Sequence, residues 1–154
     1  MIKKLSFAEI NEIAEKMSEI VKENTVIALI GELGTGKTSF TKAFAKGLGV
    51  TENLKSPTFN YCLEYRSGRM PLYHFDMYRL SSAEEIYEIG YEDCINNGGI
   101  SLIEWADIIE SELPKEYIEI KFYHLDEDNR NISIEVKNNE ELEKEVLEYV
   151  GFSY

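Results

Sequence analysis

One short segment of this 154-residue chain constrains its fold more than any other. The segment matches the pattern G-x-x-x-x-G-K-[ST], and its fixed positions are Gly31, Gly36, Lys37 and Thr38. An apolar, β-rich run, residues 25–30, comes directly before it, and a helical pattern over residues 39–49 follows. This succession of strand, glycine-rich loop and helix predicts one βα unit of a parallel sheet.

The loop has the chemistry of a phosphate-binding site. Glycine allows backbone conformations that a Cβ forbids, so successive N–H groups can turn inward around an anion. The helix that begins near Lys37 adds the positive end of its dipole, the Lys37 ammonium can reach the β- and γ-phosphates, and the Thr38 hydroxyl can ligate Mg²⁺. The residues expected to contact the nucleotide are Gly31, Glu32, Leu33, Gly34, Thr35, Gly36, Lys37, Thr38 and Ser39.

The rest of the chain alternates between helical and strand patterns. Ser6 and Glu9 form a capping box, which predicts a helix ahead of the first strand. Two hairpins are expected, one formed by residues 60–65 with 71–78 and the other by residues 117–122 with 131–136. Between them, the patterns predict a helix over residues 82–89, with a second capping box at Ser82 and Glu85, and a strand over residues 100–104. A helical stretch before Pro114 and a C-terminal helix complete the expected elements. Interleaved helices and strands predict a three-layer α/β fold, with antiparallel hairpins added to a mainly parallel core, in a single domain over residues 1–154.

The charge of the chain bears on its partners. Lys and Arg number 16 against 29 Asp and Glu, which gives a formal net charge of −13. Tight binding to a nucleic-acid backbone depends on clustered basic side chains. We therefore expect that any nucleic acid is contacted through a partner, and that the acidic C-terminal stretch is a solvated helix face.

The cellular compartment of the protein is predicted from three features: apolar runs, the N-terminal residues and the cysteines. Its apolar runs fall short of the ~20 residues that a membrane span needs, and the N-terminal residues do not read as a signal peptide. Cys62 and Cys94 fit no metal-binding or redox spacing, so they are interpreted as two buried thiols. A cytoplasmic protein without membrane contact is expected.

Glu104 is the first candidate for the acidic partner of the loop. Metal-assisted phosphoryl transfer needs a carboxylate near Mg²⁺. Glu104 follows the apolar residues 100–103 directly, and the carboxyl ends of parallel strands form the edge at which ligands bind. The alternative is an ordinary acidic residue that opens the next helix.

Asp76 is the second candidate, and it is less certain from chemistry alone. It lies in an otherwise apolar and aromatic strand, where a carboxylate is costly unless it has a partner or faces solvent. The two-residue period of a strand places His74, Asp76 and Tyr78 on one face, which predicts either a polar cluster or a solvent-facing side of the hairpin. His74 itself is interpreted as structural.

Two further residues have both a functional and a neutral interpretation. Thr58, on the loop after the first βα unit, can sense the γ-phosphate and Mg²⁺ as switch loops do, or it is a turn residue held behind Pro57. Arg79 can neutralise charge in the transition state, or it is an exposed arginine at a strand end.

Taken together, these segments resemble the bacterial tRNA threonylcarbamoyladenosine biosynthesis ATPase family, TsaE (also called YjeE). The resemblance covers roughly residues 25–107 and rests on four motifs in the same order and spacing. They are the glycine-rich loop at residues 31–38, the Ser-Pro-Thr-Phe segment at 56–59, the His-x-Asp-x-Tyr-Arg segment at 74–79 and the Glu-Trp pair at 104–105. The segment after Pro114 matches less clearly.

The resemblance implies a Mg²⁺-dependent ATPase, weak alone, that works with the threonylcarbamoyl-transferase TsaD and its inactive paralogue TsaB. Together they would place threonylcarbamoyl on adenosine 37 of tRNAs that read codons beginning with A, with tRNA contacted only through the complex. By analogy, Thr38 and Glu104 hold Mg²⁺, Lys37 binds the phosphates, and Asp76 and Thr58 support hydrolysis of ATP.

Two other functions remain open at this stage. A small-molecule kinase of this length also has a phosphate-binding loop, but it usually carries an arginine-rich lid, and the four arginines here, Arg66, Arg69, Arg79 and Arg130, are not gathered in one segment. A binding module in which ATP fixes the shape of the Thr58 loop without useful turnover is the third possibility.

Overall fold

The computed structural model describes residues 1–57 and 61–152. In this part of the chain, seven strands form one sheet in the order β1-β7-β6-β2-β5-β4-β3. The strands are β1 (Ile2–Ser6), β2 (Val26–Gly31), β3 (Cys62–Tyr65), β4 (Leu72–Asp76), β5 (Ile100–Glu104), β6 (Tyr117–His124) and β7 (Asn129–Lys137). The helical segments are α1 (Phe7–Ile20), α2 (Lys37–Leu48), η1 (Ala83–Ile89), α3 (Tyr91–Ile95), η2 (Ala106–Glu112) and α4 (Glu140–Val150), where η denotes a 3₁₀ helix.

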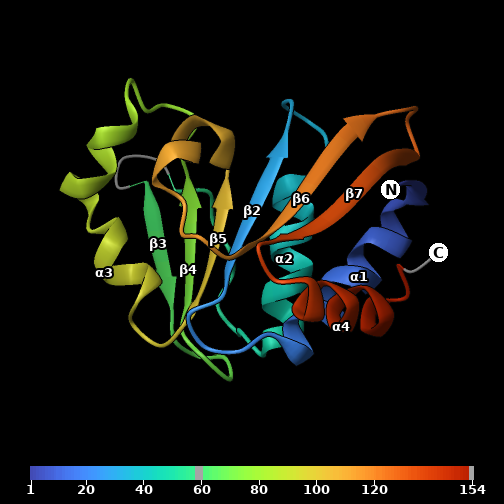
Figure 1. Ribbon diagram of the computed structural model, residues 1–154, viewed down its shortest axis with the longest axis horizontal. Helices are drawn as coiled ribbons and strands as arrows, with labels where there is room; N and C mark the ends of the chain where they lie inside the picture. Colours follow the sequence, from blue (N-terminus) through green and yellow to red (C-terminus); the bar gives the residue numbers. More distant parts are fainter. Residues whose placement is uncertain (58–60, 153–154) are drawn as a thin grey trace.

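The centre of the sheet is parallel and both of its sides are antiparallel (Figure 1). Strand β2 pairs in parallel with β5 and with β6, and β4 pairs in parallel with β5. Strands β3 and β4 form one hairpin, and β6 and β7 form the other. The predicted mixed α/β sheet is therefore confirmed, with both hairpins at the expected places apart from Asn60, which lies outside the described residues.

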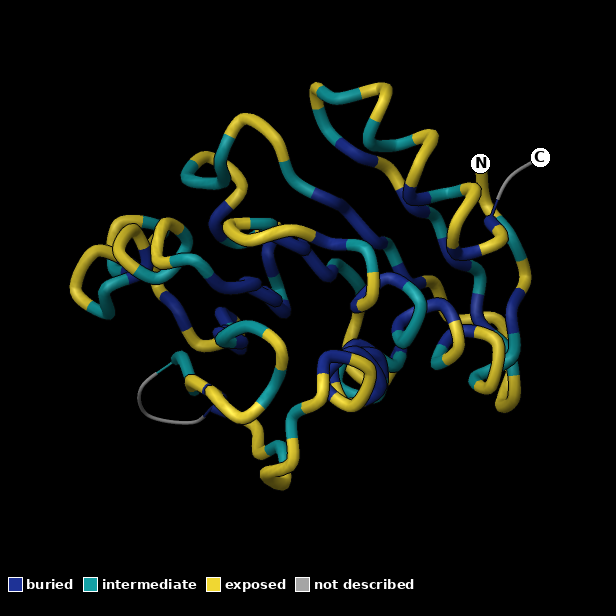
Figure 2. Tube along the Cα trace, turned by 90° about the horizontal axis from the view of Figure 1, so that it is seen from below, coloured by how far each residue is buried: buried dark blue, intermediate teal, exposed yellow. Residues whose placement is uncertain are grey.

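Hydrophobic side chains pack on both faces of the sheet. Helices α1, α2 and α4 share one buried cluster with it, and η1, α3 and η2 share a second. Strand β5 contributes to both, because Leu102 faces the first cluster and Ile103 the second. Figure 2 shows the buried segments concentrated in the central strands, with the exposed ones in the connecting loops.

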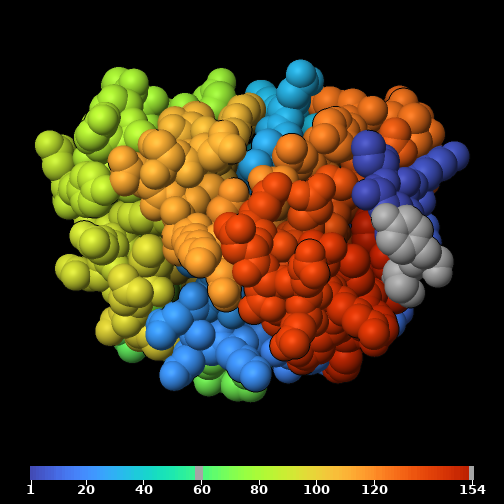
Figure 3. Space-filling model, viewed as in Figure 1, coloured from blue at the N-terminus to red at the C-terminus, as the bar shows by residue number. Residues whose placement is uncertain are grey.

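The second helical layer is incomplete beside β6 and β7. There the sheet carries polar side chains, and Glu119 forms ion pairs of 3.6 Å with Lys121 and with Lys137. The segment that follows η2 is hydrogen-bonded, at Lys115 and Glu116, to Asn138 and Asn139 at the start of α4. Helix α4 packs against β7 and is seen in red on the face shown in Figure 3. One face of strands β2 and β6 is therefore accessible near the glycine-rich loop, where it lines a pocket.

Three details differ from the sequence-based expectations. The chain begins with a strand, β1, which pairs antiparallel with β7 before α1 starts. The capping box at Ser6 and Glu9 is present, whereas the one predicted at Ser82 is absent, because the Glu85 carboxylate accepts the N–H of Ser81 instead. The segment that follows, η1, is a 3₁₀ helix that ends at Gly90, whose φ is 75°.

The two thiols also differ from the prediction. Cys62 and Cys94 are half-buried rather than buried, and they contact each other. Cys62 begins β3 and Cys94 lies in α3, so this is a tertiary contact that the sequence spacing of the two cysteines does not reveal. Burial raises the pKa of both thiols, more strongly for Cys62.

Candidate phosphate-binding site

The glycine-rich loop connects the end of β2 to the start of α2 and has the conformation that its glycines permit. Gly34 and Gly36 have φ values of 79° and 105°, in the left-handed region where a Cβ is strained. Gly31 is needed for a different reason, because a Cβ there would lie 2.7 Å from Thr35 Oγ1 and 2.8 Å from the Phe122 carbonyl oxygen. The loop thus requires glycine at three positions, which explains the sequence pattern.

Side chains from the antiparallel side of the sheet hold the tip of the loop. Arg130 of β7 donates to the Gly34 carbonyl oxygen at 3.1 Å, and its guanidinium lies 4.8 Å from the centre of the Phe7 ring. His124 Nε2 lies 3.1 Å from the Leu33 carbonyl oxygen. These carbonyl contacts orient the loop, and the sequence motif gave no sign of them.

Lys37 lies at the mouth of the loop, at the first position of α2. Its Nζ donates to the carbonyl oxygens of Gly31, at 2.5 Å, and of Glu32, at 2.8 Å. The side chain is buried, and this burial lowers its pKa, although the negative charges of Glu104 and Asp76 act in the opposite direction. A buried ammonium that donates to carbonyl oxygens of its own loop can receive the negative charge of a phosphate.

Glu104 ends β5 and reaches the first turn of α2. Its Oε1 accepts the hydroxyl of Thr38 at 3.0 Å, and its Oε2 lies 2.5 Å from His74 Nε2. The residue is only 4% exposed. The predicted pair of Thr38 and Glu104 is therefore in direct contact, across a sequence separation of 66 residues.

Asp76 joins Glu104 because their strands are parallel neighbours. The two residues occupy paired positions in the β4–β5 register, so their side chains leave the same edge of the sheet. Burial raises the pKa of Asp76 and the Glu104 charge raises it further, whereas the N–H of Tyr78, which Asp76 Oδ1 accepts at 3.0 Å, lowers it. Of the two outcomes open for this strand face, the structure has the polar cluster.

A pocket of about 360 Å³ gathers most of the predicted site residues. Its lining from the prediction is Leu33, Gly34, Gly36, Lys37, Thr38, Ser39, Asp76 and Glu104. It also contains Ser56, Tyr78 and Trp105, which the sequence argument did not place in the site. Thr58 lies outside the described residues. Arg79 is exposed and lines a small neighbouring pocket with Asp76 and Ser56.

Trp105 covers Lys37. The centre of its ring lies 4.3 Å from Lys37 Nζ, and Tyr78 packs against it with ring centres 4.8 Å apart. The Trp105 backbone is left-handed, with φ of 59° and ψ of 39°, an uncommon conformation for a bulky residue. This turn directly after Glu104 directs the ring over the loop, and the Glu-Trp pair was the signal in the sequence that could have indicated it.

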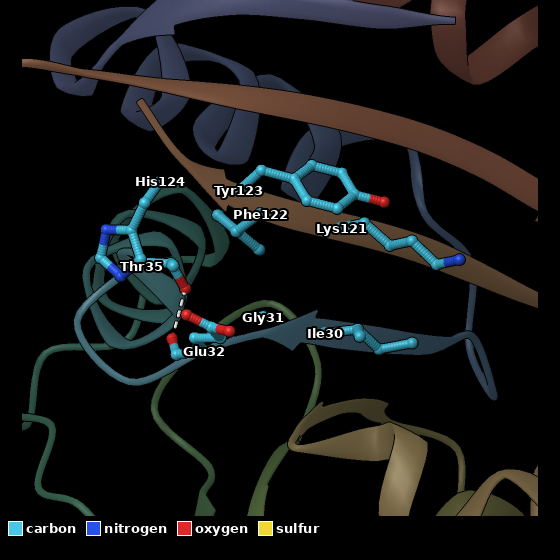
Figure 4. A pocket seen from close by; sticks show the side chains of 8 residues that line it. All are labelled: Ile30, Gly31, Glu32, Thr35, Lys121, Phe122, Tyr123 and His124. Carbon is cyan, nitrogen blue, oxygen red and sulfur yellow. Dashed lines mark hydrogen bonds between the residues drawn. The ribbon is translucent and has the colours of Figure 1, made fainter. Parts of the chain in front are cut away.

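The remaining predicted residues lie on the other side of the loop. Gly31, Glu32 and Thr35 line a pocket of about 480 Å³ together with residues 121–124 of β6. Figure 4 shows the Lys121, Tyr123 and His124 side chains on the strand above the loop, and the bond of 2.7 Å from Thr35 Oγ1 to the Glu32 carbonyl oxygen. The loop therefore separates two hollows, and the phosphate chemistry is concentrated in the smaller one.

The donor atoms fit Mg²⁺ when it arrives with a nucleotide. Thr38 offers a hydroxyl and Glu104 a carboxylate, which are oxygen ligands of the kind this hard cation prefers. Among residues 1–57 and 61–152, no group of three or more His, Cys, Asp or Glu side chains could hold a metal by itself. A cation here would thus depend on phosphate oxygens and water for its other ligands.

The centre of the sheet is parallel, the glycine-rich loop follows its central strand β2, and a carboxylate ends the adjacent strand β5. With a lysine at the mouth of the loop, these features define the P-loop NTPase fold. The sequence matches the profile of the family described as "Threonylcarbamoyl adenosine biosynthesis protein TsaE" over residues 5–132. The chain belongs to the TsaE family, which acts in the biosynthesis of tRNA threonylcarbamoyladenosine.

Individual relatives agree with this assignment. A TsaE of Bacillus subtilis is 40% identical over 131 residues, 85% of this chain and 82% of the relative. One of Haemophilus influenzae is 35% identical over 127 residues, 82% of this chain and 80% of the relative. The crystal structure of YdiB from Bacillus subtilis superimposes with a TM-score of 0.74 at 33% identity, covering 98% of this chain and 96% of that one.

In the described part of this chain, no helix has the length and apolar character required to span a bilayer.

Proposed function

We propose that this protein is a Mg²⁺-dependent ATPase that supports the formation of N6-threonylcarbamoyladenosine at position 37 of tRNAs reading codons that begin with A. The observation that carries the proposal is the contact between Thr38 and Glu104 beside Lys37, in one pocket at the end of the sheet. Membership of the family supports the role in this pathway, and the residues of the pocket support the reaction with ATP.

Each side chain has a distinct task in the proposed reaction. The loop N–H groups and the Lys37 ammonium bind the phosphates. Thr38 and Glu104 would hold Mg²⁺, which supplies neutralisation of the charge on the phosphate oxygens. Trp105 and Tyr78 line the pocket with aromatic surface and limit the entry of bulk water.

Asp76 is the residue that we assign to the attacking water. Water adds to the γ-phosphorus, the bond from phosphorus to the ADP oxygen breaks, and Asp76 accepts the proton that the water loses. A carboxylate with a raised pKa is a better proton acceptor than an ordinary one, and burial and the Glu104 charge raise the pKa of Asp76. Thr58 is proposed to act from the preceding loop as the sensor of the γ-phosphate.

The acidic surface favours an indirect role toward tRNA. With a net charge of −13, the chain is a poor match for a phosphodiester backbone. We assign tRNA contact to a threonylcarbamoyl-transferase, TsaD, and its paralogue, TsaB, with this chain as a single-domain ATPase that resets their cycle in the cytoplasm.

The test measures release of labelled γ-phosphate from ATP with Mg²⁺, by the protein alone and with the TsaD–TsaB pair and tRNA. We expect slow release of inorganic phosphate that the pair accelerates. Label transferred to a metabolite instead of water would support a kinase, and tight ATP binding without any release would support a binding module.

A further inference from the structure

His74 and Glu104 form a buried pair behind the proposed metal site. The His74 ring is fully buried, the Glu104 side chain is 5% exposed, and His74 Nε2 lies 2.5 Å from Glu104 Oε2. Because a carboxylate oxygen accepts, Nε2 is the donor of this hydrogen bond. His74 Nδ1 has no hydrogen-bond partner among the residues that the structure describes. Among the described residues, the hydrogen bond of the ring goes to an oxygen of Glu104.

The two oxygens of Glu104 have different neighbours. Oε1 faces Thr38, whose hydroxyl is 3.0 Å away at the start of α2, and Oε2 faces the interior and His74. The terminal torsion of a glutamate side chain is broad, so a carboxylate held at one oxygen can still turn. Contacts at both oxygens fix the plane of the group.

His74 reaches this position through the β4–β5 register. Asp76 is paired with Glu104, and His74, two residues earlier, lies on the same face of the sheet. His74 does not line the phosphate pocket, whereas Asp76 and Glu104 do. His74 therefore reaches the lining of the pocket through its hydrogen bond with Glu104.

We propose that His74 is a positioning residue for the cation site: its Nε2–H holds Oε2 of Glu104 and keeps Oε1 directed at Thr38 and the nucleotide-bound cation. This inference rests on the proposed function, because it assumes that Thr38 and Glu104 hold Mg²⁺. Outer partners of metal ligands commonly change metal affinity on the order of 10- to 100-fold when they are removed.

The experiment compares His74→Leu with His74→Gln. Leucine removes the donor, and the glutamine amide restores an N–H at close to the reach of Nε2. Calorimetry measures the dissociation constant of ADP with Mg²⁺ and with a chelator, and the ratio of the two constants reports how strongly the protein and the nucleotide together hold the cation. We expect the leucine substitution to reduce this ratio on the order of 10-fold or more, with ADP affinity in chelator unchanged, and glutamine to recover most of the loss.

A double-mutant cycle shows whether the effect passes through Glu104. In a Glu104→Ala background, His74→Leu should leave the ratio unchanged. An additional loss in that background would overturn the assigned route, and a glutamine variant that is folded but behaves as the leucine variant does would overturn the role of the donor.

The outcomes separate this inference from the proposed function. A wild-type protein whose ADP affinity ignores Mg²⁺ contradicts the proposed cation site itself. A wild type that responds to Mg²⁺, together with a leucine variant that responds equally, contradicts only the role of His74. If the leucine variant does not fold, the ¹⁵N NMR spectrum of the His74 ring in the wild-type protein is measured instead. The inference requires a proton on Nε2 in the Mg²⁺–ADP complex. An Nε2 that carries no proton there would overturn it.

Discussion

The ammonium of Lys37 lies 4.3 Å from the centre of the Trp105 ring while it donates hydrogen bonds to two carbonyl oxygens of its own loop. A cation over an aromatic face is stabilised by about 0.5–2 kcal/mol, depending on its desolvation. The lysine is therefore satisfied before any phosphate enters, and an incoming phosphate competes with the loop carbonyls and the indole ring.

Nucleotide binding should consequently change the fluorescence of Trp105. It is the one tryptophan in the sequence, so emission excited at the red edge of indole absorption, where tyrosine does not absorb, reports the surroundings of this ring. Titration with Mg²⁺–ADP should alter its intensity in a saturable manner. An emission spectrum that stays constant while calorimetry shows saturation would mean that Lys37 keeps its contact with the ring.

Lys37→Ala should reduce the proposed hydrolysis by about 100-fold or more, because it removes a preorganised positive charge at the phosphates. Lys46→Ala is the matched control, since Lys46 lies in the same helix with a side chain that is 81% exposed. Steady-state phosphate release measures both. Equal activity in the two variants would place the phosphates elsewhere.

Asp76→Asn should separate stability from activity. Burial raises the pKa of Asp76 above its ordinary value of 3.8, so the charged form is disfavoured in the folded state. The ionised carboxylate then costs stability as the pH rises through the interval between the two pKa values, and the cost is constant above it. The asparagine variant should unfold at a higher temperature than the wild type at pH 7, and the difference should vanish at acidic pH.

The same variant should lose hydrolysis by about 100-fold or more, because an amide accepts no proton from water. It can still accept the Tyr78 N–H, so the local turn is preserved. Thermal unfolding at several pH values and phosphate release at pH 7 test the two parts. A variant that is less stable at pH 7 would contradict the sign of the pKa shift.

Cys62 should react slowly with alkylating reagents in the folded protein. Burial raises its pKa, which reduces the thiolate that attacks, and Cys94 beside it is affected less. Iodoacetamide at pH 8 followed by mass spectrometry should modify Cys94 first, and both thiols at equal rates in denaturant. Faster modification of Cys62 in the native state would show that its burial is not maintained in solution.

Local patterns predicted the parts of this fold that local contacts create. The βα unit around Lys37 and the hairpin of β6 with β7 are formed by residues close in sequence, so periodicity and turn residues were enough. Strand β1 was missed because its stability comes from β7, at the other end of the chain. Its five residues carry little periodic signal without that partner.

In the candidate site, too, some residues were predicted from local motifs and others depend on contacts between distant segments. Motif chemistry indicated the loop, Glu104 and Asp76, and the structure brings both carboxylates to one pocket with Lys37 and Thr38 of the loop. The Glu-Trp pair could have indicated that Trp105 belongs to the site, but its position over Lys37 depends on one left-handed residue that the sequence does not show. Nor could it reveal that His74 donates to Glu104, because diagonal contacts across parallel strands depend on the register.

That register also has a consequence for how the protein folds. The phosphate loop belongs to the pairing of β2, while Glu104 and Asp76 arrive on β5 and β4, and Ile27 is paired with Leu102 and with Ile118 on its two sides. Such non-local pairings form late, because their loop-closure entropy must be overcome first. A newly made chain with only its local structure would have the phosphate loop without the two carboxylates. The onset of nucleotide binding in a refolding experiment should therefore mark completion of the central sheet.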